Sequence, residues 1–355
     1  MPLTTAGLIV GAYGLLQTIL RLPTGVLGSR SSFSRLIMVS GALILSISSF
    51  MLLMVKTASL LWCARALAGV SAATWVCFSV FYGQAFSNDD KRSMGYMVSA
   101  NNLGMMLGYI FAAIFNDILG IEFLFAASAV AAAMAGILLI VLFRDMPSQG
   151  CTAGASLSDM GAVLKNGRIW SCSLLTALSQ LISFATMISF SANYAVSTGC
   201  TGAQVGMISV VNTDAGLIAS SLIASGKLEF VPQKWLVSLG FVLMLIYCIF
   251  LPKCLGIDGL LILQFLGGIG RTFIMTTMMA GTISGIAPVQ KTMAMGIIQS
   301  VYGLGMTLGP ILMGWLLDET SGYSSAFSVV AAICLAGAAS ALILKTENKR
   351  AEHAM

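Results

Sequence analysis

The amino-acid sequence predicts an all-α polytopic membrane protein that consists of two related helical bundles. Of its 355 residues, 58% are hydrophobic and only 9% are charged, whereas about a quarter of the residues in soluble domains are charged. The mean hydropathy of +0.94 agrees with this. The chain also repeats itself, because Gly104 and Gly108 recur 201 residues later as Gly305 and Gly309. Such a duplication in an apolar chain is typical of membrane proteins with two homologous halves.

Long apolar runs predict the individual helices, because a helix needs about 20 residues to cross a bilayer. In chain order, the eleven predicted spans are residues 6–28, 36–55, 59–85, 94–116, 121–143, 169–193, 203–226, 235–253, 257–285, 292–316 and 323–344. The sequence lacks the alternation of polar and apolar residues that a membrane β-barrel requires. Each run is therefore expected to be a transmembrane helix.

The basic residues orient these helices. Thirteen Lys and Arg residues fall in the loops on one side of the membrane, and only Lys56 and Lys253 fall on the other. Short cytoplasmic loops retain Lys and Arg, so we expect the richer side and the C-terminus to be cytoplasmic. The thirteen residues are Arg30, Arg35, Lys91, Arg92, Arg144, Lys165, Arg168, Lys227, Lys234, Lys291, Lys345, Lys349 and Arg350.

The repeat also predicts the domains. We expect an N-terminal bundle of five helices at 1–145, a cytoplasmic linker at 146–168, a six-helix bundle at 169–345 and a cytoplasmic tail at 346–355. Within the linker, the stretch that ends at Lys165 is expected to lie as a helix on the membrane surface. The span that begins near Ile169 has no repeat partner, because its counterpart would precede Met1 by about 32 residues. We therefore expect the first of twelve spans to be missing through truncation, a misassigned start or real shortening.

Three groups of arginine, glycine and proline residues form recognisable motifs. They are Arg21, Pro23 and Gly25 followed by Arg30 and Arg35; Leu61, Arg65 and Gly69; and Gly104, Gly108, Gly305, Gly309 and Pro310. They resemble, respectively, the loop signature after the second helix, the fourth-helix arginine motif, and the glycine-rich motifs of the fifth and eleventh helices of the major facilitator superfamily of secondary transporters. The resemblance covers nearly the whole chain, and it matches the first helix here to the second helix of that family.

This resemblance implies a carrier in which two bundles rock about a binding site near the middle of the membrane. Some positions depart from the motifs. Ser29 and Ser32 stand where the loop signature usually has an acid and a glycine, and Tyr109 stands where drug and proton antiporters usually have a proline. The departures weaken the interpretation as a drug antiporter without removing it.

Charged and polar residues within the spans are the candidate substrate-binding residues, since a charge at a helix centre costs about 2.5–3.5 kcal/mol on insertion scales. Arg271 lies near the middle of its span, and Arg65 lies in the outer third of another. We expect both to contribute to substrate recognition, with Gln264 as a polar neighbour. Arg21 lies close to the cytoplasmic end of its helix, and its side chain is expected to reach the lipid headgroups.

Asp214 is the only acidic residue far from the ends of a predicted span. It reaches a depth similar to that of Arg271, so an ion pair between the two is sterically plausible. Intramembrane carboxyl groups often take part in proton relays. We therefore expect Asp214 to couple transport to proton movement.

The paired glycines are expected to allow close helix contact, because residues four apart share one face of a helix. This applies to Gly104 with Gly108 and to Gly305 with Gly309. The motif residues as a group are expected to act in packing and conformational change.

Several functions are disfavoured. The only histidine is His353 in the polar tail, no P-loop motif occurs, and the eight cysteines contain no CxxC pair. We therefore expect no enzyme activity, no cofactor, no metal and no nucleic-acid partner. The expected partners are a small-molecule substrate, a proton or other ion, and membrane lipid, and a monomer in a bacterial cytoplasmic membrane is the expected form.

Two substrate classes remain open. The deep arginines suit uptake or exchange of an anionic metabolite, and the methionine-rich segments suit efflux of amphipathic compounds. A channel and a membrane protein that no longer transports are further alternatives.

Overall fold

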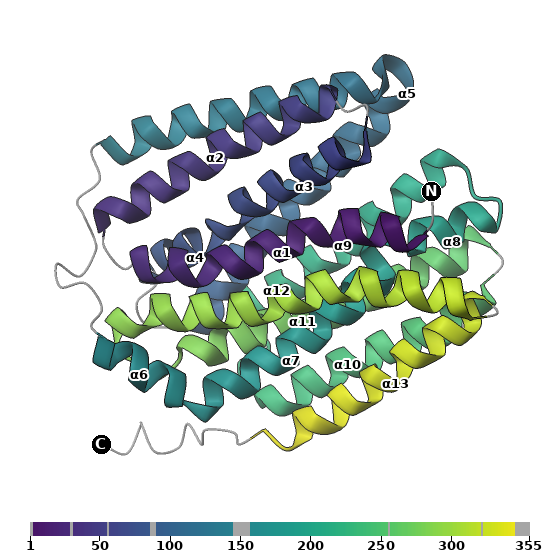
Figure 1. Cartoon of the computed structure of the whole chain (residues 1–355). Helices are drawn as coiled ribbons and strands as arrows, with labels where there is room; N and C mark the ends of the chain where they lie inside the picture. The colour runs from purple at the N-terminus through teal and green to yellow at the C-terminus, as the bar shows by residue number, and fades with distance from the viewer. Residues whose placement is uncertain are drawn as a thin grey trace.

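The structure is a computed structural model, and it describes residues 3–28, 31–54, 57–85, 90–144, 157–254, 256–320 and 322–344. Ten helices in this part of the chain are long and apolar enough to cross a membrane, and the long helix α1 lies beside them (Figure 1). The expected all-α polytopic fold is thereby confirmed. The elements are α1 Leu3–Leu27, α2 Ser31–Leu53, α3 Ala58–Ala73, α4 Trp75–Ala85, α5 Asp90–Arg144, α6 Leu157–Lys165, α7 Gly167–Ser183, η1 Phe184–Ile188, α8 Ser191–Ser197, α9 Gly202–Ala224, α10 Gln233–Phe250, η2 Leu251–Lys253, α11 Ile257–Ile283, α12 Pro288–Glu319 and α13 Tyr323–Leu342.

Four predicted spans differ in detail from simple helices. The fourth and fifth spans, 94–116 and 121–143, are joined within α5 at Gly120, whose φ of 77° and ψ of 169° reverse the chain without a loop. A glycine adopts such a positive φ without the steric cost that a Cβ would add. The third span, 59–85, is interrupted between α3 and α4 at Thr74, whose hydroxyl donates to the Ser71 carbonyl oxygen at 2.7 Å. The span at 169–193 contains a π-helical turn, η1, between α7 and α8.

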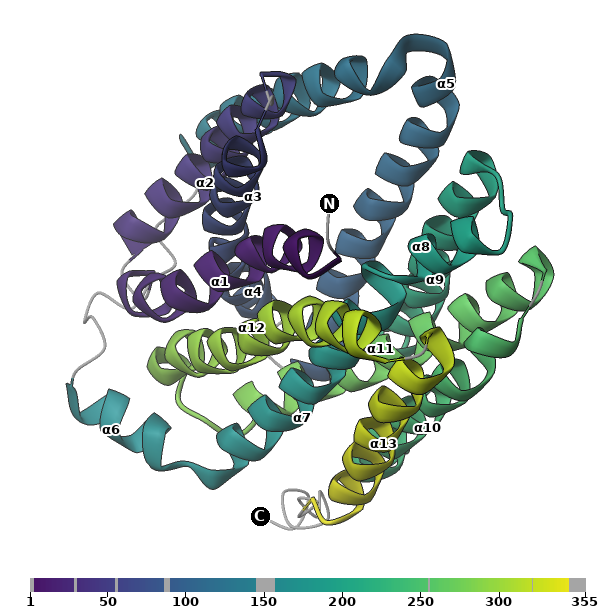
Figure 2. The same ribbon diagram turned by 45° about the vertical axis from the view of Figure 1, so that its right-hand side comes forward.

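The packing of the helices repeats between the two halves. With the 201-residue offset, α9 corresponds to α1, α10 to α2, α11 to α3 with α4, and α12 and α13 to the two arms of α5. α2 packs against α3 and α5, just as α10 packs against α11 and α13. The interface between the halves also obeys this pseudo-twofold relation, because it consists mainly of α1 against α12 and of α5 against α9. Figure 2 shows α5 rising beside α9 and returning along α2.

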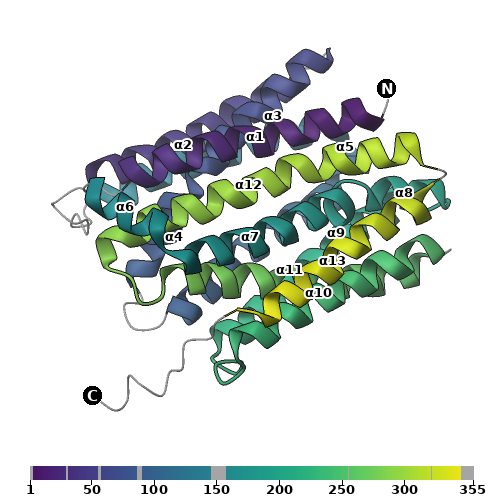
Figure 3. The same cartoon turned by 60° about the horizontal axis from the view of Figure 1, so that its bottom comes forward.

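We call one end of the bundle the basic end. α1 and α9 finish there, α2, α5, α7 and α10 begin there, and it carries Arg35, Arg92, Arg168, Lys227 and Lys234. At the end of the linker the chain forms a helix, α6, which packs against α7 and α12 at this end (Figure 3).

Glycines bring α1 and α12 into backbone contact along much of their length, and Figures 1 and 3 show the two helices side by side. A Cβ atom added to Gly14 would lie 2.8 Å from the Thr307 amide nitrogen, and one added to Gly25 would lie 3.1 Å from the Gly296 Cα. Real Cβ atoms essentially never approach another atom as closely as the 2.8 Å found at Gly14. The contact between the two halves therefore depends on the absence of side chains here.

The α5–α9 interface is instead closed at one end only. At the basic end, the Arg92 Nε donates to the Ala224 carbonyl oxygen at 3.2 Å, and the Ser99 hydroxyl donates to the Ser220 hydroxyl at 2.9 Å. Toward the opposite end, a space of about 260 Å³ lined by residues such as Ile110 and Met207 separates the two helices.

Candidate functional site

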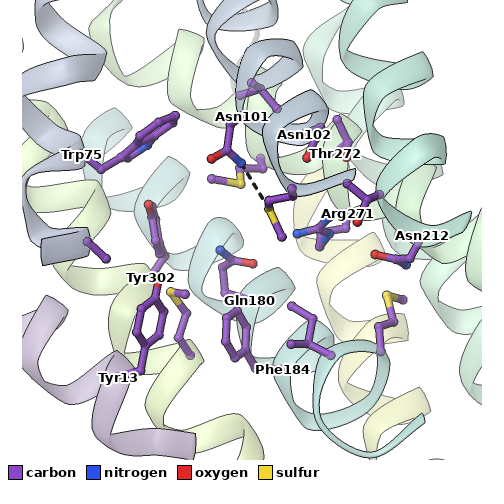
Figure 4. Close-up of a pocket in the computed structure, with 18 of the residues that line it drawn as sticks. Tyr13, Trp75, Asn101, Asn102, Gln180, Phe184, Asn212, Arg271, Thr272 and Tyr302 are labelled. Atoms are coloured by element: carbon purple, nitrogen blue, oxygen red, sulfur yellow. Dashed lines mark hydrogen bonds between the residues drawn. The ribbon is translucent and has the colours of Figure 1, made fainter. Parts of the chain in front are cut away.

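A cavity of about 420 Å³ lies between the two halves (Figure 4). Small-molecule sites usually have volumes of roughly 300–1,000 Å³. Side chains from α1, α3, α4 and α5 line it on one side, and side chains from α7, η1, α9, α11 and α12 line it on the other. The cavity is therefore large enough for a small molecule, and both halves contribute to its lining.

Arg21 lines this cavity and does not reach the headgroups, which corrects the sequence-based expectation. Its side chain is only 3% exposed. The guanidinium Nη1 donates to the Gln299 carbonyl oxygen at 3.0 Å, and the Cζ lies 4.5 Å from the centre of the Tyr302 ring. Since Gln299 and Tyr302 belong to α12, they draw Arg21 inward and make it a link between the two halves.

Arg65 also points toward the cavity, on the side formed by the first half. Its Cζ lies 5.4 Å from the centre of the Tyr13 ring on α1. A cation over an aromatic face is stabilised by the ring quadrupole, by about 0.5–2 kcal/mol. Among the described residues, the charge of Arg65 is therefore stabilised by an aromatic ring and not by a carboxylate.

Arg271 contributes the third guanidinium group, from α11 in the second half. It is half-buried, and its Nε has no hydrogen-bond partner among the described residues. Tyr109 on α5 lines the same cavity as Arg271 and Arg65. Arg271 therefore has hydrogen-bonding capacity that the described part of the protein does not use.

Other buried polar atoms around the cavity also lack partners in the described part of the chain. They include both amide atoms of Gln17, the Nδ2 of Asn102 and the Oε1 of Gln180. A buried polar group without a hydrogen bond costs about 1–3 kcal/mol. Water or a polar solute in the cavity would remove this cost.

Asp214 and Arg271 do not form the ion pair that their similar depth suggested. Asp214 is half-buried on α9 and lies outside the cavity lining, which includes the preceding residues Asn212 and Thr213. Within the described residues it has no ion-pair partner. α9 and α11 do pack together, but Arg271 faces the cavity and Asp214 lies on another side of its helix.

Gln264 lies in the packed interior of the second half and not in the cavity lining, contrary to the expected role in binding substrate. Its Oε1 accepts from the Asn212 Nδ2 at 3.0 Å, and its Nε2 donates to the Tyr247 hydroxyl at 3.3 Å. Both ends of the amide are therefore occupied, and Asn212 is the member of this network that reaches the cavity.

The two glycine pairs differ in their surroundings. A Cβ on Gly305 would contact the Ala177 carbonyl oxygen and lie 2.8 Å from the Leu181 amide nitrogen, and one on Gly309 would lie 2.5 Å from the Leu181 carbonyl oxygen. A Cβ on Gly104 or Gly108 would meet no atom within 4 Å. The close contact expected for the first pair is thus wrong for this structure, because no described helix takes the place beside α5 that α7 takes beside α12.

The remaining motif residues lie outside the cavity lining. Pro23 is exposed within α1 and Pro310 is buried within α12. Arg35 is half-buried near the start of α2, and Arg30 lies outside the described residues. Within the described part, no group of three His, Cys, Asp or Glu side chains is placed to hold a metal ion.

Several cavity residues were not identified from the sequence. They are Tyr13, Gln17, Trp75, Tyr109 and Tyr302. A signal for some of them exists, because Tyr13, Gln17 and Arg21 are spaced by four residues, which places them on one face of a helix.

Two related helical bundles with a polar cavity between them are the architecture typical of secondary membrane transporters. The sequence matches the model of the Major Facilitator Superfamily over residues 1–213 and again over residues 172–354. Together these matches extend over nearly the whole chain. The protein therefore belongs to the Major Facilitator Superfamily.

Relatives and solved structures agree with this assignment. The chain is 24% identical over 344 residues to the uncharacterized MFS-type transporter MJ1560 of Methanocaldococcus jannaschii, which covers 92% of this chain and 87% of the relative. The fold is similar to that of the human organic anion transporter MFSD10 (TETRAN), with a TM-score of 0.74, 15% identity and coverage of 95% of this chain and 83% of the other. It is also similar to a mutant of the nucleoside transporter NupG, with a TM-score of 0.73, 14% identity and coverage of 96% and 91%.

Proposed function

We propose that the protein is a secondary active transporter that moves a small organic solute across the cytoplasmic membrane by alternating access, with the basic end and the C-terminus in the cytoplasm. The central cavity, lined by both halves, is the observation that carries this proposal. A channel would not need a binding site divided between two related bundles.

The contacts at the basic end support a state in which this end is closed. Besides the Ser99–Ser220 hydrogen bond between α5 and α9, the Gln299 Nε2 donates to the Ser79 hydroxyl at 3.3 Å between α12 and α4. Each of these contacts joins one half to the other. Opening of the cavity toward the basic end requires that they break, while the space between α5 and α9 at the opposite end closes.

Cross-linking of this closed end is expected to stop transport. Ser99→Cys combined with Ser220→Cys, in a background without native cysteines, places two thiols where hydroxyls now lie 2.9 Å apart. Oxidation to a disulfide should reduce counterflow of radiolabelled organic solutes into proteoliposomes by at least about tenfold, because the halves can no longer separate. A reductant should restore it.

The Ser99→Cys single variant, treated with the same oxidant, is the control and should keep its activity. A cross-linked double variant that transports at the full rate would contradict alternating access at this interface.

We also propose that transport of the solute is coupled to movement of an ion. The arginines make the cavity suited to an anion, and entry of one negative charge against about 150 mV, inside negative, costs about 3.5 kcal/mol. Accumulation of an anion inside the cell therefore requires a co-transported cation or exchange for another anion, whereas export of an anion does not. We propose proton coupling through Asp214, the carboxyl group one position from the cavity-lining residue Thr213.

Asp214→Asn is expected to abolish accumulation driven by a pH gradient while leaving counterflow intact, because exchange of solute for solute needs no net proton movement. Both activities can be measured in the same proteoliposomes. Asp258→Asn is the matched control, since Asp258 is exposed in the first turn of α11. Full pH-driven accumulation by Asp214→Asn would remove Asp214 from the mechanism.

A further inference from the structure

We propose that the substrate is an amphipathic organic anion, whose acidic group binds Arg271 and whose flat apolar body lies across the cavity toward Trp75. This inference rests on the proposed transport function, and it assigns one solute class where the sequence left two open. In Figure 4, Arg271 and Trp75 lie on opposite sides of the space, with Gln180 and Phe184 between them.

The charge of the cavity selects an anion. Three arginines are among the described residues that line it, and none of these residues is Asp or Glu. A cationic solute would enter a space that already holds uncompensated positive charge. Taking two like charges out of water and close together is unfavourable, whereas an anion is attracted by all three guanidinium groups.

Arg271 is the arginine that is available for direct binding. Arg21 is bonded to the Gln299 carbonyl oxygen and stacked on Tyr302, and Arg65 is stacked on Tyr13. Arg271 makes no such hydrogen bond or aromatic contact among the described residues, and its Nε, like that of Arg21, is buried without a hydrogen-bond partner. A guanidinium fork that is free on one edge fits the two oxygens of a carboxylate or sulfonate.

A second donor lies near Arg271. The Nδ2 of Asn102 is buried and without a partner in the described part of the chain. The Asn102 Nδ2 and the Thr272 hydroxyl lie close together beside Gly216, since each is 3.0 Å from the position that a Gly216 Cβ would take. Since Thr272 follows Arg271 directly in α11, the amide, the hydroxyl and the guanidinium form a polar corner that an oxyanion can satisfy.

The rest of the cavity selects an apolar body. Besides Trp75 and Phe184, the lining contains Met105, Met187, Met275 and Met306. Methionine side chains are flexible and polarisable, and they make favourable contacts with aromatic rings. A short anion such as acetate would leave these surfaces unfilled.

Binding to the purified full-length protein tests this inference with 2-naphthoate as the probe. The comparison compounds are 2-naphthamide, which has the same rings without the charge, and acetate, which has the charge without the rings. We expect 2-naphthoate to bind at least about tenfold more tightly than either, because a hydrogen bond to a charged group contributes more than one to a neutral group. Titration calorimetry or tryptophan fluorescence provides the dissociation constants.

The variant Arg271→Gln should remove the preference for 2-naphthoate over 2-naphthamide, and Lys227→Gln is the matched control because Lys227 is exposed in the loop after α9. Should Arg271→Gln fail to fold, Arg271→Lys retains the charge but loses the planar fork, and it should weaken 2-naphthoate binding while leaving 2-naphthamide binding unchanged.

Equal binding of the naphthalene acid and amide would overturn the anion assignment, and equal binding of acetate would overturn the apolar body. Retention of the acid preference in Arg271→Gln would overturn the role of this arginine. Arg271-dependent binding without counterflow would uphold the site and refute the transport function. Counterflow of other solutes without 2-naphthoate binding would uphold the transport function and refute the proposed substrate site.

Discussion

Gly305→Ala is expected to destabilise the protein by about 1–3 kcal/mol, the usual cost of inserting a methyl group into a well-packed contact. The added Cβ would press on the backbone of α7 at Ala177 and Leu181, and neither backbone atom can move aside without displacing the helix. Gly104→Ala changes the equivalent position of the first half, where the Cβ meets nothing within 4 Å. It should leave stability unchanged or raise it by up to about 1 kcal/mol, because alanine favours a helix over glycine.

Thermal unfolding of the two purified variants in the same detergent measures this difference. The pair Gly309→Ala and Gly108→Ala repeats the comparison one helical turn further along and should give the same order. If Gly104→Ala cost as much stability as Gly305→Ala, the face of α5 at Gly104 would be closely packed in the folded protein, and the asymmetry described above would be wrong.

Arg21→Gln is expected to shift the protein away from the state that is closed at the basic end. The substitution removes the hydrogen bond to the Gln299 carbonyl oxygen and the stack on Tyr302. Hydrogen bonds to charged groups contribute about 1.5–3 kcal/mol, and cation–π contacts contribute about 0.5–2 kcal/mol. A loss of even 1.4 kcal/mol changes the ratio of the two states by about tenfold.

The rate at which the Ser99→Cys and Ser220→Cys pair forms its disulfide reports this equilibrium, and Arg21→Gln should slow it. Arg168→Gln serves as the control, because Arg168 lies at the basic end but outside the central cavity. An unchanged rate in Arg21→Gln would mean that the link between α1 and α12 does not hold this end closed.

The helices could be predicted from the sequence because length and apolarity determine them. Each predicted span corresponds to described helices, and the offset that pairs Gly104 with Gly305 also pairs the contacts of α2 with those of α10. The breaks were not predicted. A glycine within an apolar run, such as Gly120, gives no sign of its φ, and the turn at Thr74 depends on a local hydrogen bond.

The candidate site was predicted in part, since Arg65 and Arg271 stand out through the cost of placing charge in a membrane. Residue counting gives the depth of a side chain but not the direction it takes around the helix axis. For that reason an ion pair between Asp214 and Arg271 was sterically plausible from the sequence, and Arg21 was expected to reach the headgroups. The Gln299 carbonyl oxygen on α12, which accepts the hydrogen bond from Arg21, lies 278 residues away in the sequence, beyond the reach of any local pattern.

The two interfaces between the halves differ in how they can be remodelled. Along α1 and α12 backbone atoms come into close contact at several points, as at Gly14 with Thr307 and at Gly25 with Gly296. Away from the Arg21 contacts with Gln299 and Tyr302, this close backbone approach leaves little room for interlocking side chains, so the two helices can tilt on one another with few changes of rotamer. The α5–α9 interface is held at the basic end by discrete donors and acceptors, which release over a short distance. The α1–α12 contact can therefore persist while the two halves reorient, whereas the α5–α9 contact at the basic end forms in one state and is lost in the other.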